Sequence, residues 1–181
     1  MEIIKTSIKE LFIIKPKVFE DERGYFFESF KESFIESNFP EIRFVQDNES
    51  KSSYGVLRGL HFQKPPFEQT KLVRVISGKV LDVAVDLREH SESFGKWESV
   101  ILSAENKKQF LIPKGFAHGF VVLSDEAIFS YKVDNYYNRY SESGIKYNDK
   151  ELNINWQITP KDIKLSEKDK NLQTLSLLTK K

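Results

Sequence analysis

The sequence contains no cysteine and only three histidines, and its charges almost cancel. Without cysteine, the protein cannot hold a disulfide framework, a zinc-thiolate site or a cysteine nucleophile. The 28 Lys and Arg residues against 27 Asp and Glu residues give a formal net charge of +1. This balance argues against a nucleic-acid partner and against an acidic solvating tail. An anionic ligand would have to be met by local positive charge.

Long apolar runs are also missing. The first segment, Met1–Lys17, mixes Glu and Lys into short apolar runs. No apolar run in the sequence is long enough to cross a bilayer. We therefore expect a cytoplasmic protein with no membrane partner. A chain of 181 residues fits one domain, residues 1–181, which is large enough to bury a core without disulfides or metals.

Short apolar segments separated by Gly, Asn and Ser are the main pattern. They predict a strand, turn and strand at 11–30, one short helix at Lys31–Asn38, and further strands at 44–46, 55–63, 71–76, 79–87, 97–102, 110–112, 120–123 and 127–133. Many short strands at such spacing favour an all-β sandwich or barrel. The C-terminal extension begins at about residue 150. Its tail, Leu152–Lys181, is expected to be solvated.

Polar groups are concentrated in two neighbouring predicted strands. Arg58 and His61 lie in the segment Gly55–Gln63, and Lys71 follows after a Pro-Pro turn. Charged groups cannot be buried unpaired, so they should face a cavity. Strict alternation along the first strand would place Arg58 on the face opposite Leu57 and His61.

The three histidines can be weighed separately. His90 lies in a polar turn and is expected at the surface. His118 follows a Pro and a Gly at a tight strand entry, where a hydrogen-bonded core histidine is the more common outcome. His61 is the best functional candidate, because a cation and amides lie close to it in sequence.

Other kinds of site fit less well. A metal-binding β-barrel would have a His-x-His pair, but position 63 is Gln, so we expect no metal. The sequence contains neither a Gly-x-Ser-x-Gly elbow nor a phosphate-binding loop. Acid–base chemistry without a cofactor remains. The tyrosine-rich segment Ser130–Tyr137 offers an acid beside lysines, and Leu165–Asp169 offers a carboxylate that could orient an imidazole.

Several segments together resemble the dTDP-4-dehydrorhamnose 3,5-epimerase family, cofactor-free sugar epimerases of the cupin superfamily. They occur in the family's order at Phe19–Glu28, Phe44–Asn48, Val56–His61, Lys71–Val73, Gly78–Arg88, Ile112–Phe120, Tyr131–Lys132, Trp156 and Leu165–Asp169. The resemblance implies a cupin-type jelly roll with a few short helices. It also implies a homodimer in which the N-terminal strands join the neighbouring subunit's sheet.

The resemblance further implies an activity and residue roles. The substrate would be a nucleotide-diphosphate 4-keto-6-deoxy sugar, and no cofactor would be needed. His61 would be the base, Asp169 its orienting partner, Tyr131 the proton donor and Lys71 the group that stabilises the enolate oxygen. The residues that match substrate-binding positions of the family are Arg23, Glu28, Gln46, Asn48, Arg58, His118, Tyr137, Glu142 and Lys168.

Three rival functions remain open at this point. The same fold could act at C3 alone, or on another nucleotide sugar such as a GDP-linked 6-deoxy-heptose. A noncatalytic sugar-binding cupin would keep Arg58 but should have lost His61 or Tyr131, and both are present. A metal-dependent cupin oxygenase is the third rival. The sequence departs from the family mainly in the loop Lys64–Thr70.

Overall fold

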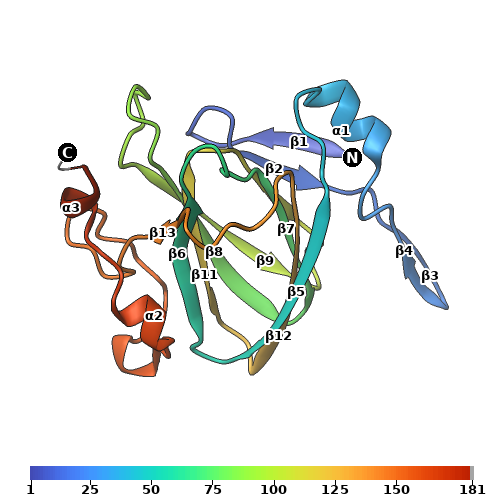
Figure 1. The fold of residues 1–181 in the computed structure, drawn as a ribbon. Helices are drawn as coiled ribbons and strands as arrows, with labels where there is room; N and C mark the ends of the chain where they lie inside the picture. The colour runs from blue at the N-terminus through green and yellow to red at the C-terminus, as the bar shows by residue number, and fades with distance from the viewer. Residues whose placement is uncertain (180–181) are drawn as a thin grey trace.

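The computed structural model describes residues 1–179, and of Thr179 only the backbone. Residues 180–181 of the predicted domain lie outside this range. Two antiparallel sheets pack face to face, and a small hairpin projects from them (Figure 1). The all-β, cupin-type jelly-roll prediction is confirmed, and the two sheets do not close into a full barrel.

The larger sheet has six strands in the order β1-β2-β10-β7-β12-β5. These strands are β1 (Glu2–Lys5), β2 (Phe12–Lys15), β10 (Gln109–Ile112), β7 (Lys71–Ser77), β12 (Glu126–Val133) and β5 (Gln46–Ser53). The second sheet has the order β13-β6-β11-β8-β9. Its strands are β13 (Glu142–Gly144), β6 (Leu57–Gln63), β11 (Phe116–Val122), β8 (Lys79–Asp86) and β9 (Trp97–Ser103).

The core between the sheets follows from alternation along each strand. Val73 and Val75 of β7 point inward and pack with Phe116 and Phe120 of β11, whereas Leu72 points outward. Helix α1 (Glu32–Asn38), predicted within one residue, covers this outward face of the larger sheet. The inward positions of β7, β8, β11 and β12 therefore decide what faces the space between the sheets.

The N-terminal part differs from the predicted strand, turn and strand. The first strand stops at Lys15, because Pro16 has no N–H to continue the ladder. A separate hairpin follows, made of β3 (Phe19–Asp21) and β4 (Gly24–Phe26), and it projects away from both sheets (Figure 1). Strand β1 was not predicted from the sequence.

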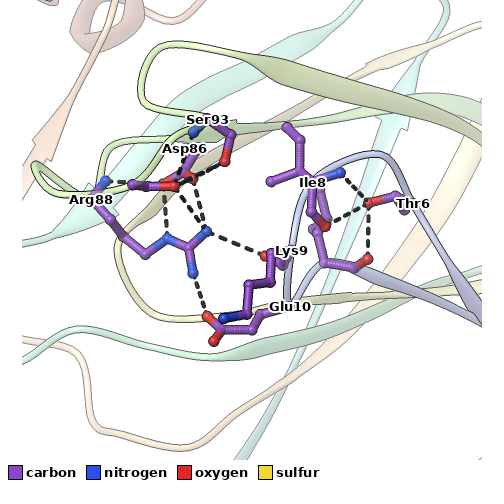
Figure 2. A network of polar contacts seen from close by, with 9 residues as sticks. Thr6, Ile8, Lys9, Glu10, Asp86, Arg88 and Ser93 are labelled. Atoms are coloured by element: carbon purple, nitrogen blue, oxygen red, sulfur yellow. Dashed lines mark hydrogen bonds and ion pairs between the residues drawn. The ribbon is translucent and has the colours of Figure 1, made fainter.

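A charged cluster anchors the β1–β2 connection to the end of β8 (Figure 2). The Arg88 guanidinium donates to both carboxylate oxygens of buried Asp86 at 2.9 and 2.8 Å, and it also contacts Glu10 and the carbonyl oxygen of Lys9. Burial favours the neutral acid, but hydrogen bonds from Arg88 and Ser91 outweigh it and lower the pKa of Asp86 to about 2.

The C-terminal tail is not a solvated extension, so that prediction is wrong. The outer face of the five-stranded sheet, which carries Leu57 and Leu81, is covered by the tail. There the side chains of Leu152, Trp156 and Leu175 are buried. Short helices η1 (Pro160–Asp162), α2 (Glu167–Lys170) and α3 (Leu175–Thr179) interrupt the tail. An apolar sheet face needs a cover, and the tail supplies it. Within residues 1–179, no helix is long and apolar enough to cross a membrane.

Candidate active site

A cavity of about 660 Å³ opens between the two sheets. Strands β5, β6, β7, β11 and β12 line it together with the segment around helix α2. The ionisable and hydrogen-bonding side chains around it are Asn48, Glu49, Ser50, Arg58, His61, Lys71, His118, Tyr131, Lys164, Ser166, Lys168 and Asp169. All four predicted catalytic residues, which come from distant parts of the sequence, therefore share this cavity.

An irregularity in strand β6 places Arg58 and His61 on the same face. In the pairing of β6 with β11, His61 lies opposite His118 and Arg58 lies opposite Phe120, so three steps on β6 match two on β11. This bulge interrupts the two-residue period. The prediction that Arg58 and Leu57 point to opposite faces of the strand is confirmed, but the prediction that Arg58 and His61 do so is wrong.

His61 is hydrogen-bonded to Asp169 of helix α2, with 2.5 Å between Nε2 and Oδ1. Ser166 caps this helix, accepting a hydrogen bond from the Asp169 backbone N–H and donating its hydroxyl to Asp169 Oδ2 at 2.7 Å. Burial favours the neutral acid, but the hydrogen bonds from His61 and Ser166 outweigh it and hold the pKa of Asp169 below its ordinary value. Asp169 is thus a fixed carboxylate that can orient the imidazole.

Tyr131 and Lys71 reach the cavity from the sheet opposite His61. Both lie at inward positions, Tyr131 on β12 and Lys71 on β7. Burial raises the pKa of the Tyr131 phenol, although the positive charge of Arg58 opposes the shift. The phenol therefore stays protonated at neutral pH. It is suited to give a proton rather than to begin as a base.

Lys71 is held in an environment that disfavours its charge. Burial lowers the pKa of its ammonium group to about 8, and the negative charges of Asp82 and Glu142 limit this fall. The side chain can carry a proton near neutral pH and lose it in mildly alkaline solution. An ammonium group at this position can stabilise an anion that forms in the cavity.

His118 combines the two interpretations considered for it. It is buried, with 7% of its surface exposed, and its Nε2 lies 3.0 Å from each carboxylate oxygen of Asp82. It also lines the cavity beside His61. Burial lowers its pKa, with Asp82 opposing the change, so the ring is neutral at physiological pH.

Apart from His118, the predicted substrate-binding residues fall into three groups, and the first lies on strands β5 and β6. Arg58 donates from Nε to Ser52 Oγ at 3.1 Å, and Gln46 donates its amide to Asn48 Oδ1 at 2.8 Å. Strand β5 was largely missed from the sequence, because its residues QDNESKSS lack the β-branched and aromatic side chains that mark strands.

A second group is linked to the cavity through Lys168, which lines it. Tyr137 donates its hydroxyl to Glu142 at 3.0 Å, and Lys168 forms an ion pair with the same carboxylate. Burial favours the neutral acid, but these two partners outweigh it and lower the pKa of Glu142. Glu142 thereby ties the loop of Tyr137 to helix α2, which also carries Asp169.

The third group, Arg23 and Glu28, does not join the cavity. Arg23 lies on the projecting hairpin, where its guanidinium pairs with Asp21, and Glu28 pairs with Lys31 at 3.1 Å. Within a single chain, neither Arg23 nor Glu28 therefore lies in the cavity with His61.

Two residues of the site were not identified from the sequence. Asp82 interrupts the apolar run of β8, KVLDVAVD, at an inward position, and a charge at such a position was the available signal. Ser166 precedes helix α2 with the spacing of a helix cap, a signal obscured by the surrounding charges. Asp82 was not singled out because it stands alone in an apolar run, and Ser166 was passed over within the charged segment Leu165–Asp169.

No metal centre can be built from the residues that the structure describes, since no group of three or more His, Asp or Glu side chains is arranged to hold an ion. His61 and His118 are each engaged with one carboxylate. The prediction that the reaction needs no metal stays a prediction.

Comparisons with known proteins agree with this geometry. The family model for dTDP-4-dehydrorhamnose 3,5-epimerase matches residues 5–176. The enzyme of that name from Shigella flexneri is 55% identical over 174 residues, covering 96% of this chain and 95% of its own length. The crystal structure of the epimerase from Elizabethkingia anophelis is 57% identical, with a TM-score of 0.92 and 97% of each chain covered.

A second solved structure includes a ligand. The epimerase from Legionella pneumophila, in complex with dTDP-4-keto-L-rhamnose, is 52% identical, with a TM-score of 0.94, and the match covers 98% of this chain and 94% of that chain. The family model spans nearly the whole chain, and these relatives are more than one half identical to it. The protein belongs to the dTDP-4-dehydrorhamnose 3,5-epimerase family.

Proposed function

We propose that the protein converts dTDP-4-keto-6-deoxy-D-glucose into dTDP-4-keto-L-rhamnose without a cofactor. The observation that supports this most strongly is the arrangement around the cavity: the His61–Asp169 pair belongs to one wall, and Tyr131 projects from the opposite sheet. Inverting a carbon requires a base on one face of the sugar and an acid on the other. Two facing sheets provide that separation.

The reaction follows from the acidity of hydrogens beside a ketone. His61 removes the proton from C3 or C5, and the electron pair of the broken C–H bond delocalises onto the 4-keto oxygen as an enolate. The Lys71 ammonium stabilises this oxygen. Tyr131 then gives its phenolic proton to the same carbon from the other face, and exchange with solvent restores both groups. Each such proton transfer contributes about 10²–10⁴-fold to the rate.

Asp169 and the cationic side chains complete the proposal. Asp169 would hold His61 with Nε2 protonated, which leaves Nδ1 as the basic nitrogen. Arg58 would pair with the diphosphate, since a guanidinium can donate two parallel hydrogen bonds to phosphate oxygens. Asn48, Gln46, His118, Tyr137, Glu142 and Lys168 would bind the remainder of the nucleotide sugar.

Incubation with dTDP-4-keto-6-deoxyglucose in heavy water, followed by NMR, tests this function. Deuterium should enter at both C3 and C5, and His61→Ala should abolish both exchanges. Entry at C3 alone would establish the single-carbon rival. Absence of exchange would contradict the proposal and direct the assay to GDP-linked 4-keto sugars.

The other rivals give different results in the same preparation. A noncatalytic sugar-binding cupin would bind the nucleotide sugar without any exchange. A metal-dependent oxygenase would contain a stoichiometric transition metal by elemental analysis. The cytoplasmic location and a role in supplying L-rhamnose for surface polysaccharide are further parts of the proposal.

We also propose a homodimer in which the projecting hairpin reaches the second subunit's cavity. Three aromatic side chains of the hairpin, Phe19, Tyr25 and Phe26, are 53%, 57% and 67% exposed. Aromatic side chains exposed on a two-stranded hairpin are typical of an interface. The same arrangement would bring Arg23 to a site that it does not reach in its own chain.

Mixed dimers test this arrangement. Arg23→Ala and His61→Ala should each be inactive alone, but subunits exchanged between them should regain activity, because one of the two sites in a mixed dimer has both residues. A solution mass of 21.2 kDa, that of a single chain, would contradict the homodimer. A dimer with no regained activity would contradict the shared site.

A further inference from the structure

One carboxylate within the core has no role in the reaction as described so far. Asp82 lies at the middle of β8, at an inward position between Val80 and Ala84, and none of its surface is exposed. Removing a carboxylate from water is costly unless it is paired and hydrogen-bonded. Among the described residues, the hydrogen bonds of its carboxylate go to one side chain, that of His118.

The bond to His118 determines how that ring is presented. Both Asp82 oxygens are 3.0 Å from Nε2 of His118. A carboxylate only accepts hydrogen bonds, so Nε2 carries the proton and Nδ1 is the acceptor of the neutral ring. A ring held in this tautomer can accept a hydrogen bond from a sugar hydroxyl but cannot donate one from Nδ1.

Asp82 also acts on Lys71 across the space between the sheets. Lys71 projects inward from β7, and Asp82 projects inward from β8 of the facing sheet. The negative charge of Asp82 is the larger of the two that favour the protonated form of Lys71, and the other comes from Glu142.

Other charged groups surround Lys71. The ionisable side chains of the elements around it are Arg58 and His61 on β6, His118 on β11, Tyr131 on β12, Glu142 on β13, Asp134 after β12, Glu49 on β5, Lys164 before helix α2, and Lys168 and Asp169 on helix α2. Asp134 is engaged with Lys114 and with the Thr70 backbone N–H, and Glu142 with Lys168. Asp82 lies behind His118 and has no exposed surface, and among the described residues it forms no ion pair with a Lys or Arg. Its charge therefore acts on Lys71 without a competing cation.

We propose that Asp82 is a positioning residue of the epimerase reaction: its carboxylate holds His118 in one tautomer and balances the ammonium charge of Lys71. This inference rests on the proposed function. Asp82 does not touch the reacting carbon and acts through the two side chains that do face the cavity. This role explains why a charged residue occupies a core position that an apolar residue could fill.

Asp86 provides a matched control. It lies four residues further along the same strand, also inward and fully buried, but its partners are Arg88, Ser91 and Ser93 at the end of the sheet (Figure 2). Asp86→Asn removes an equally buried charge that does not face the cavity. It should lower thermal stability without changing the pH dependence of turnover.

The first test compares pH profiles of Asp82→Asn and Asp86→Asn with the wild type. Wild-type kcat/KM should fall as pH rises through about 8, where Lys71 loses its proton. In Asp82→Asn the fall should begin about one pH unit lower or more, the size of effect that one nearby opposite charge produces. The kcat of this variant should drop about 10²-fold, as on loss of one oxyanion donor.

Asp82→Ser keeps an acceptor oxygen but no charge, and it should show the same displacement of the pH profile. This variant replaces Asp82→Asn in the test if the Asn variant does not fold. A merely structural role predicts reduced folded protein with an unchanged profile, as in Asp86→Asn. An unchanged profile in a folded Asp82 variant would overturn the inference.

A second test needs no turnover, so it separates this inference from the proposed function. The chain has three histidines, and nitrogen-15 NMR distinguishes ring nitrogens that carry a proton. His118 of the wild type should show protonated Nε2 across neutral pH, and Asp82→Asn should show a mixture of tautomers. Carbon-13 NMR of Lys71 should report a lower pKa in the same variant. Spectra identical to the wild type would overturn the inference even if the wild type is an active epimerase.

Discussion

His61 and Asp169 lie 108 residues apart in the chain, and their side chains meet at 2.5 Å in the cavity. The contact depends on the C-terminal tail, which packs against the outer face of the five-stranded sheet and returns helix α2 to the mouth of the cavity. The segment that seemed to be a solvated terminus therefore completes the site.

Replacing Asp169 by Asn should remove the orienting carboxylate while keeping the shape of the side chain. An amide can donate to Nε2 of His61 and so favour the tautomer whose Nδ1 is protonated and no longer basic. We expect kcat to fall about 10²–10⁴-fold. Deuterium exchange at C3 and C5 measures the loss. Glu167→Gln, on the same helix but exposed and paired with Lys170, is the control and should exchange normally.

Replacing Tyr131 by Phe should separate exchange from inversion. His61 can still remove a proton and return a solvent deuteron to the same face, but no acid remains on the other face. We expect inversion to fall about 10²–10⁴-fold while some deuterium still enters the unchanged epimer. Comparing the NMR signals of substrate and product measures both. Equal rates of inversion in the variant and the wild type would remove Tyr131 from the donor role.

Replacing Lys71 by Met should reduce turnover more than binding. The ammonium acts on an oxygen that becomes negative only during the reaction, so its loss should cost about 2.7–4 kcal/mol in the activation free energy. Burial disfavours the charged form, so the wild-type group is protonated below a pKa of about 8 and neutral above it. Activity should therefore fall as pH rises through this value, and in the Met variant this fall should disappear. Steady-state kinetics from pH 6 to 10 would show it.

Replacing Gly59 by Ala should destabilise the sheet that carries His61. A Cβ at Gly59 would lie 2.5 Å from the Gly119 Cα, at a positive φ of 129°. Gly24 has a similar φ of 126° but open space around it, on the projecting hairpin. Both variants should incur the backbone cost of about 1–3 kcal/mol, but only Gly59→Ala adds a collision with the neighbouring strand β11.

Thermal unfolding and activity of the two glycine variants measure the difference. Gly59→Ala should unfold at a lower temperature than Gly24→Ala and should lose epimerase activity in proportion to folded protein. Equal unfolding temperatures would show that β6 and β11 can separate without cost.

The sequence alone determined the fold class, the position of most strands and the family. Short runs of β-branched and other apolar residues, bounded by turn residues, mark strands such as Lys71–Ser77 and Lys79–Asp86. The ordered motifs identified the family, and they named candidate residues that the structure places around the cavity. These signals are local in the chain, so no tertiary information was needed.

The tertiary structure alone decided which side chains face one another. The bulge in β6 turned Arg58 and His61 to the same side, and strict alternation could not predict it. Strand β5 formed from polar residues because β12 offers it an unpaired edge. The tail was buried because the sheet face beneath it is apolar. Asp82 of β8 is hydrogen-bonded to His118 of the neighbouring strand β11. Such outcomes depend on contacts between distant segments, whose energies no single stretch of the chain contains.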